Sequence, residues 1–207
     1  NAARPHQGFH DHGLFHRGPV RGNAVDHRRC LGGGSILPGI LQTFGTDYTM
    51  KRPYKFGLIG HNISYSKSGE VFETIFDQLN LKGEFIVYST DPGSFKNQLI
   101  NFRSNGTRGF SVTIPYKNEI IDHLDDIDPI AHALKAVNCV VVDEGRLLGF
   151  NTDCYGFPIP LKPHSSMLKH GRAVIIGCGG AAAAVVYSLY LDFEIKNFTV
   201  LGRNDKN

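Results

Sequence analysis

The sequence predicts an α/β fold in which a mostly parallel sheet, with helices on both faces, precedes the start of a Rossmann dinucleotide-binding domain. Two observations carry this prediction. Short apolar runs alternate with helical patterns from Lys55 onward, and that order is typical of parallel sheets. Near the C-terminus, the apolar run 173–176 leads into Gly177-Cys178-Gly179-Gly180 and an alanine-rich helical pattern. This second arrangement is typical of a nucleotide-binding βαβ unit.

Composition excludes several classes of protein. Of the 207 residues, 41% are apolar and 20% are charged, and no apolar run approaches the roughly 20 residues that a membrane span requires. The net charge of +3 comes without a long basic stripe, which argues against nucleic acid as a partner. The four cysteines form no C-x-x-C pair, so we expect neither a zinc site nor a disulfide framework. These features fit best a protein that binds no metal and is located in a reducing cytoplasm.

Residues 1–50 differ from the rest of the chain. They contain five of the ten histidines and no sustained apolar period. One interpretation is a metal-binding tract built from His10, His12 and His16. We favour the other, a disordered or non-native extension, and Met50 then marks the expected start. The last residues stop where a strand has just finished, so we also expect the chain to be a fragment that lacks a C-terminal part.

The expected elements follow in order from Tyr54. Strands are predicted at residues 54–59, 84–88, 110–114, 137–142, 146–150, 173–176 and 198–201. The first predicted helix follows a Ser68 cap and has Val71, Phe72, Ile75, Phe76 and Leu79 on one face, and the second follows a Ser94 cap and has Phe95, Leu99 and Phe102 on one face. A short helix is predicted around Ile120, Ile121 and Leu124, and another begins at Asp128-Pro129. The last predicted helix spans residues 181–191. Pro158, Pro160 and Pro163 indicate a linker.

These elements predict three parts after the N-terminal extension. Residues 54–157 form the substrate domain, residues 158–171 the linker, and residues 172–207 a partial nucleotide-binding domain. Because the third part has only two strands and one helix, we expect it to expose apolar area and to exchange its amide hydrogens rapidly.

The stretch from Gly109 to Lys117 organises the first domain. Apolar and hydroxyl side chains alternate from Phe110, and Pro115 ends the strand because proline has no N–H to donate. If a helix follows, Lys117 lies in its first turn, at the end of the sheet where ligands of α/β folds bind. A helix N-terminus carries partial positive charge, so this lysine suggests a nearby carboxylate, an anionic ligand or a proton-transfer role. A solvated surface lysine is the alternative.

Further polar residues are candidates for the same site. Ser66 and Ser68 flank a lysine at a helix start, where an anion such as a carboxylate is favoured, although Ser68 can simply cap the helix. Asn138 lies in an apolar strand and needs hydrogen-bond partners, which a satisfied core amide would also have. Asp153 precedes the linker, where an ordinary capping aspartate is the alternative. Lys117 and Asp153 together would form a proton-handling pair.

The chain from about Lys55 to Asp205 resembles the shikimate dehydrogenase family. The resemblance rests on five motifs in the family's order, which read Ser66-Lys67-Ser68, Val112-Thr113-Ile114-Pro115-Tyr116-Lys117, Ala136-Val137-Asn138, Leu148-Gly149-Phe150-Asn151-Thr152-Asp153 and Gly177-Cys178-Gly179-Gly180-Ala181. Gly69 stands where the family usually has proline, and only the arginine of its N-R-T motif remains, as Arg203.

The resemblance implies NADPH-dependent reduction of 3-dehydroshikimate to shikimate, a step in chorismate and aromatic amino acid biosynthesis. It implies catalytic roles for Lys117 and Asp153, and substrate binding by Ser66, Ser68, Thr113 and Asn138. It places the cofactor on Gly177, Gly179, Gly180, Ala181 and Arg203. NADP is the expected cofactor, with NAD as the alternative, and the expected assembly is a monomer or homodimer.

Two other functions stay open at this point. One is an NAD(P)-dependent quinate/shikimate dehydrogenase, and the other is a ligand-binding homologue that has lost catalysis. Retention of both Lys117 and Asp153 speaks against the second, because binding alone needs no proton-transfer pair. Because the remainder of the nucleotide domain is missing, we expect the 207-residue chain alone not to turn over NADPH.

Overall fold

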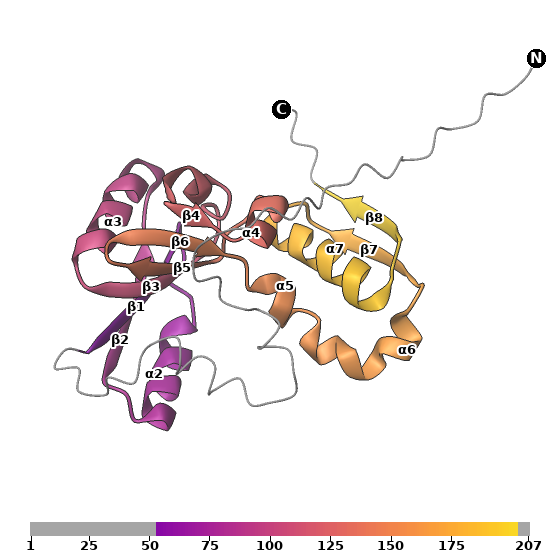
Figure 1. Ribbon diagram of the computed structural model, residues 1–207, viewed down its shortest axis with the longest axis horizontal. Coiled ribbons are helices and arrows are strands. Elements are labelled where there is room, and N and C mark those ends of the chain that lie inside the picture. The colour runs from indigo at the N-terminus through magenta and orange to yellow at the C-terminus, as the bar shows by residue number, and fades with distance from the viewer. Residues whose placement is uncertain (1–52, 203–207) are drawn as a thin grey trace, which may run out of the picture. The chain divides into compact units, whose positions relative to one another are not determined.

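The computed structural model describes residues 53–202, which contain two sheets (Figure 1). The predictions made for residues 1–50, including the histidine tract and Met50, and for Arg203 lie outside this range. The six-stranded sheet has the order β2 (Gly83–Ser89), β1 (Tyr54–Gly60), β3 (Thr107–Val112), β5 (Cys139–Asp143), β6 (Arg146–Phe150) and β4 (Asp126–Ile127). The two-stranded sheet pairs β7 (Arg172–Ile176) with β8 (Asn197–Leu201).

The helices alternate with these strands along the chain. They are α2 (Ser68–Leu79), α3 (Pro92–Ser104), the 3₁₀ segment η2 (Glu119–His123), α4 (Pro129–Leu134), α5 (Asp153–Gly156), the 3₁₀ segment η3 (Ile159–His164), α6 (Ser165–Leu168) and α7 (Gly180–Phe193). Strand pairs β1–β2, β1–β3, β4–β6 and β7–β8 are parallel, whereas β3–β5 and β5–β6 are antiparallel. The prediction of an α/β fold with a mostly parallel sheet is confirmed.

Helices α2 and α3 cover opposite faces of the large sheet because strand side chains alternate between faces. On one face, Phe85 of β2 stacks on Phe72 of α2, and Phe56 of β1 packs against the same ring in a tilted arrangement. On the other face, Phe102 of α3 stacks on Phe110 of β3 with the ring centroids 4.2 Å apart. This second face holds the main core, whose fully buried members include Ile59, Phe95, Leu99, Tyr116, Val137 and Val140.

Helix α2 buries fewer residues than its sequence pattern suggests. Phe76 is buried and Phe72 packs with the aromatic cluster, but Val71, Ile75 and Leu79 are exposed. The five residues share one face of the helix by their spacing, but only part of that face is buried. A helix on a sheet contacts it along a stripe of about 100°, and the two phenylalanines occupy that stripe here.

Two predicted N-caps also differ in the structure. The N-cap position of α2 is Lys67, and Ser68 is the first helical residue. Helix α3 begins at Pro92 after an Asp91 N-cap, so Ser94 lies inside the helix. In both cases the helix begins one to three residues earlier than expected. The predicted Asp128 cap of α4 is confirmed, because its carboxylate accepts hydrogen bonds from the Ile130 and Ala131 N–H groups.

The two-stranded sheet and the helical segments before it share a smaller core. Leu189 and Phe193 of α7 pack with Ala173 and Phe198 of the two strands. Leu161 and Leu168, from the proline-rich segment 158–171, pack against the same cluster. That segment contains η3 and α6, so the predicted linker is largely helical.

Strand β7 is less buried than its apolar sequence suggests. Val174 is 66% exposed and Ile176 is 87% exposed. Ala173, on the opposite face, packs in the small core together with residues of α7. Within the described range, no helix is long and apolar enough to cross a lipid bilayer.

Candidate active site

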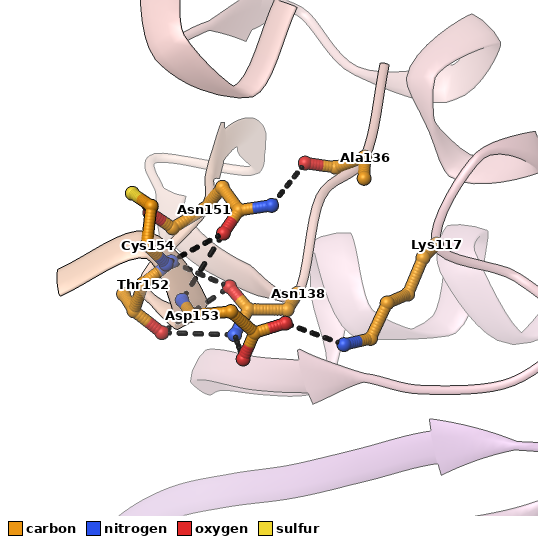
Figure 2. Close-up of polar contacts among 7 residues, drawn as sticks. All are labelled: Lys117, Ala136, Asn138, Asn151, Thr152, Asp153 and Cys154. Atoms are coloured by element: carbon orange, nitrogen blue, oxygen red, sulfur yellow. Dashed lines mark hydrogen bonds and ion pairs between the residues drawn. The ribbon is translucent and has the colours of Figure 1, made fainter. Parts of the chain in front are cut away.

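Four chain segments meet at one edge of the large sheet because of its strand directions. The carboxyl ends of the parallel strands β1 and β3 lie at this edge. Strand β5 runs antiparallel to β3 with Ser111 opposite Cys139, so Asn138, just before β5, lies at the same edge. Strand β6 runs antiparallel to β5 and ends at Phe150 opposite Cys139, which brings the following residues there too. The sheet therefore gathers Lys117, Asn138 and Asp153 from distant parts of the chain (Figure 2).

Lys117 lies in a turn after β3. The predicted helix that Pro115 would open does not form: strand β3 ends at Val112, the Ile114–Pro115 peptide bond is cis, and the next helical segment begins at Glu119. The backbone carbonyl of Lys117 instead accepts a hydrogen bond of 2.8 Å from the Val137 N–H. This contact ties the turn to the segment that leads into β5.

The side chain of Tyr116 packs into the core and holds the turn in place. Its side chain is fully buried, its ring stacks on Phe95 with centroids 4.0 Å apart, and its hydroxyl donates a hydrogen bond of 2.6 Å to the Thr90 carbonyl. Burial is the main cause that raises the pKa of the Tyr116 hydroxyl, so the hydroxyl stays a neutral donor. The side chain next to the lysine is therefore a rigid support.

Lys117 and Asp153 form an ion pair. The distance from Lys117 Nζ to Asp153 Oδ2 is 2.7 Å, and the two side chains are 17% and 33% exposed. Both groups are thus partly withdrawn from water yet accessible to a small molecule. The predicted pairing of these two residues is present in the structure (Figure 2).

Asn138 fixes the other oxygen of Asp153. Its Nδ2 group lies 2.6 Å from Asp153 Oδ1 and 2.9 Å from Thr152 Oγ1, and its Oδ1 accepts a hydrogen bond of 2.7 Å from the Thr152 N–H. Asn138 lies directly before β5 and not inside the strand as predicted. Because the carboxylate of Asp153 receives one donor on each oxygen, its orientation is defined from two sides.

Asn151 belongs to this site as well, although it was not among the predicted site residues. Its side chain is 1% exposed. Its Nδ2 donates to the Ala136 carbonyl at 2.9 Å, and its Oδ1 accepts from the Asp153 and Cys154 N–H groups at 3.1 and 3.4 Å. Asn151 therefore joins the segment before β5 to the first turn of α5. The residue type was the available signal, because an asparagine side chain often bonds to the backbone N–H two residues on, which here belongs to Asp153.

Ser66 and Ser68 lie after β1, at the same edge of the sheet. The Ser66 hydroxyl donates to Ser68 Oγ at 3.0 Å and accepts from the Ser68 N–H at 3.2 Å. Thr113 lies beside the end of β1: a Cβ atom on Gly60 would be 2.6 Å from Thr113 Cγ2. Among residues 53–202, no hydrogen bond joins these three side chains to Lys117 or Asp153. All three follow strands whose carboxyl ends lie at this edge of the sheet.

The glycine-rich turn after β7 has features that suit a phosphate group. Gly177 has a φ of +115°, a conformation that other residues rarely adopt. A Cβ atom on Gly179 would meet nothing within 4 Å, which leaves room for a ligand to approach the backbone. Gly179 is also the N-cap of the 14-residue helix α7 and provides no side-chain cap, so the first N–H groups of α7 have no such partner. Ala181 lies in that first turn.

Gly180 has a different environment from its neighbours. A Cβ atom there would be 3.0 Å from Ala136 Cβ and 3.6 Å from both Cβ and Cδ of Lys117. The start of α7 therefore approaches the lysine turn closely. The lack of a side chain at Gly180 therefore has a packing reason within the chain.

Cys154, the residue after Asp153, is a buried free cysteine. Burial is the main cause that raises the pKa of the Cys154 thiol to about 11, so it is not a thiolate nucleophile at neutral pH. Its Sγ instead lies 3.2 Å from the Asn151 carbonyl. Within residues 53–202, no group of three histidine, cysteine or acidic side chains is arranged to hold a metal ion.

Comparison with known proteins agrees with this geometry. The family described as "Shikimate dehydrogenase substrate binding domain" matches residues 58–140. A shikimate dehydrogenase (NADP(+)) from Shouchella clausii is 42% identical over 137 residues, which are 65% of this chain and 50% of the relative. The chain thus spans about half the length of the curated relatives it matches.

The chain is also similar to solved structures of shikimate dehydrogenases and of a related reductase, over about half of their length. Shikimate 5-dehydrogenase from Thermus thermophilus in complex with shikimate is 34% identical, covers 73% of this chain and 57% of its own, and has a TM-score of 0.67. A 5-ketofructose reductase from a Gluconobacter strain, solved without ligand, is 30% identical, covers 75% of this chain and 55% of its own, and has a TM-score of 0.66. Residues 58–140 thus match the shikimate dehydrogenase substrate binding domain, and the chain is similar to about half of the length of curated and solved shikimate dehydrogenases.

Proposed function

We propose that this chain belongs to an NADPH-dependent dehydrogenase that reduces 3-dehydroshikimate to shikimate. The observation that carries the proposal is the Lys117–Asp153 ion pair at the sheet edge where Ser66, Ser68 and Thr113 also lie. A carboxylate-bearing hydroxy-ketone needs such a set: hydroxyl and N–H donors for its carboxylate, and an acid–base group at its carbonyl.

Lys117 supplies the proton that the reduction requires. When bound, the nicotinamide cofactor supplies a hydride, which turns the ring carbonyl into an alkoxide. The Lys117 ammonium group gives one N–H proton to that oxygen and becomes a neutral amine, which water can reprotonate. Asp153 holds the ammonium group in place through its 2.7 Å contact, and Asn138 fixes the carboxylate in turn.

The substrate carboxylate is assigned to Ser66 and Ser68. Their hydroxyl groups lie 3.0 Å apart at the start of the 12-residue helix α2. Two hydroxyl groups beside a helix N-terminus favour an anion, because both the hydroxyls and the helix dipole interact well with negative charge. Asn138 and Thr113 are assigned to the ring hydroxyls, which their amide and hydroxyl groups can bind.

The residues of the glycine-rich turn fit a dinucleotide. We assign the pyrophosphate to Gly177, Gly179, Gly180 and Ala181, since Gly179 leaves its backbone accessible and the first turn of α7 has no side-chain cap. Arg203 is assigned to the 2′-phosphate of NADP, which a guanidinium group binds bidentately. These assignments divide the chain into a substrate domain at residues 54–157, a connecting segment at 158–171 and a nucleotide-binding part from residue 172.

The experiment that tests the proposal measures NADPH oxidation by the full-length gene product with 3-dehydroshikimate as substrate. We expect turnover in the wild type and a loss of about 10²-fold or more in kcat for Asp153→Asn, because the amide no longer balances the Lys117 charge. Tight binding of shikimate with no turnover would instead indicate a ligand-binding homologue.

Substrate class is tested in the same assay. The likeness to 5-ketofructose reductase makes a different hydroxy-ketone a specific alternative. The ketone form of quinate, 3-dehydroquinate, and 5-ketofructose are therefore assayed beside 3-dehydroshikimate. A higher kcat/KM for either one would contradict the assignment to shikimate.

A binding experiment on the 207-residue chain tests the carboxylate site without catalysis. We expect Ser66→Ala and Ser68→Ala to weaken shikimate binding about tenfold each in calorimetric titrations, because each removes a hydrogen-bond donor to a charged group. Ser94→Ala is the matched control, since Ser94 lies exposed inside α3. Equal effects from all three variants would contradict the assignment.

A further inference from the structure

Helix α7, which follows the glycine-rich turn, bonds to helix α5, which begins with Asp153. The Ser188 hydroxyl of α7 lies 2.8 Å from the backbone carbonyl of Cys154, the residue after Asp153. Ser188 is 1% exposed, so water does not compete for this contact. The two helices also pack against each other.

The Cys154 carbonyl needs this donor because the regular hydrogen-bond pattern of its own helix does not supply one. Phe157 (φ −58°, ψ −45°) and Pro158 (φ −74°, ψ −18°) keep helical backbone angles after α5. The helical partner of the Cys154 carbonyl would therefore be the N–H of residue 158. Proline has no N–H. The preceding amide, Phe157 N–H, donates to the Asp153 carbonyl at 2.9 Å and is already engaged.

The Ser188 hydroxyl has a second acceptor within reach, the Ala184 carbonyl at 2.9 Å. A serine inside a helix often bonds to that i−4 carbonyl. Ala184, however, lies in the interior of α7, where the Ser188 backbone N–H is the regular partner of its carbonyl. The hydroxyl proton therefore stabilises the structure more when it is directed to Cys154, because a buried carbonyl without a partner is costly.

The start of α7 makes an independent contact with the same site. A Cβ atom on Gly180 would be 3.0 Å from Ala136 and 3.6 Å from Lys117. Ser188 follows Gly180 by eight residues, which corresponds to about 12 Å along the helix axis. Helix α7 thus touches the Lys117 turn at its first residue and the Asp153 helix about two turns later.

We propose that Ser188 is a positioning residue that fixes α7, and with it the glycine-rich turn, relative to Asp153. The inference rests on the proposed function for its catalytic consequence. Asp153 and Lys117 act on the substrate carbonyl, whereas the turn before α7 is assigned to the cofactor. The hydroxyl-to-carbonyl bond joins these two parts where the helical hydrogen-bond pattern of α5 is interrupted by Pro158.

Pro158 offers a rescue experiment that separates two roles of Ser188. In Ser188→Ala, the Cys154 carbonyl loses its donor and α5 loses its bond to α7. Adding Pro158→Ala supplies an N–H at the helical i+4 position, which satisfies the carbonyl without restoring the bond between helices. Pro158→Ala alone completes a double-mutant cycle. Ser165→Ala is the matched control, because it removes a hydroxyl-to-carbonyl bond of 2.6 Å at an exposed position outside this contact.

Two readouts are measured for each variant. Amide hydrogen exchange of α5 and α7 is followed in the 207-residue chain, and kcat and KM are measured in the full-length gene product. Exchange in α7 is expected to be fast relative to the large sheet already in the wild type, and we expect Ser188→Ala to speed exchange in both helices by a further factor of about ten. We expect it to lower kcat about tenfold with little change in substrate KM, because small misplacements of reacting groups reduce the rate of the chemical step.

The double variant decides between the roles. We expect exchange in α5 to return towards the wild-type rate, while exchange in α7 stays fast and kcat stays low. If the double variant regains both α7 protection and kcat, Ser188 only satisfies the carbonyl and the proposal is overturned. If the wild type shows no turnover, the proposed function fails, and the exchange of α7 in the double variant still tests the contact on its own.

Discussion

Lys117 Nζ lies 2.7 Å from Asp153 Oδ2, although the two residues are 36 positions apart in the chain. The pair is close because β3, β5 and β6 run in alternating directions, so that the end of β3 and the end of β6 lie at one edge of the sheet. Lys117 lies in the turn after the end of β3, and Asp153 lies shortly after the end of β6. The ion pair is therefore a consequence of sheet topology.

Replacement of Lys117 by methionine tests its role as the proton donor. The Lys117→Met substitution keeps a long, unbranched side chain and removes the ammonium group. We expect kcat of the full-length gene product to fall by about 10²–10⁴-fold, with a smaller change in KM, because positioned acid–base groups contribute in this range. Lys82→Met, at an exposed position, is the control. A raised KM at unchanged kcat would show that Lys117 only binds substrate.

Asn151 is expected to contribute to stability as well as to the geometry of the site. Asn151→Leu removes the donor to the Ala136 carbonyl and the acceptor for the Asp153 N–H. We expect the free energy of unfolding, measured by urea denaturation, to fall by about 1–3 kcal/mol. Asn151→Asp keeps the acceptor and loses the donor, so it separates the two contacts. The exposed Asn97→Leu is the control, and an equal loss in that variant would refute the prediction.

Asp125 is expected to make stability depend on pH. A hydrogen bond from the Leu147 N–H, and then one from Arg103, hold the pKa of the Asp125 carboxyl below its ordinary value of 3.8. A lowered folded-state pKa stabilises the fold at pH values above the unfolded-state pKa. That stabilisation is lost as the pH falls through the folded-state pKa. In Asp125→Asn, the free energy of unfolding should decline less steeply below about pH 4, as followed by denaturation at several pH values.

Arg203 is expected to determine cofactor preference. The residue lies outside residues 53–202, so its role stays a prediction from the sequence. A guanidinium group binds a phosphate bidentately, and NADP differs from NAD by its 2′-phosphate. Arg203→Ala should therefore reduce kcat/KM for NADPH much more than for NADH. Equal losses with both cofactors would mean that Arg203 does not bind that phosphate.

The amino-acid sequence by itself determined the fold class, and it pointed to Lys117, Asn138 and Asp153, which the structure brings together. Alternating apolar patterns indicated the strands, and the glycine-rich turn before an alanine-rich helix indicated the βαβ unit that the structure contains. The Asp128 cap of α4 was also readable, because an aspartate followed by proline is a local signal. These features depend on neighbours within a few residues of each other.

Only the tertiary structure decided which side chains meet and which faces are buried. The periodic pattern of α2 could not show that Phe72 and Phe76 contact the sheet while Val71 stays exposed. Pro115 suggested the start of a helix, but the structure has a turn there. In this turn, the Lys117 carbonyl accepts a hydrogen bond from the Val137 N–H.

Asn151 and Ser188 show why the buried hydrogen bonds of the site could not be predicted from the sequence. The Ala136 carbonyl that Asn151 binds lies 15 residues earlier in the chain, and the Cys154 carbonyl that Ser188 binds lies 34 residues earlier. A buried hydrogen bond depends on which donor and acceptor the fold brings together away from water. That pairing is set by strand order and helix packing, which residue spacing alone does not specify.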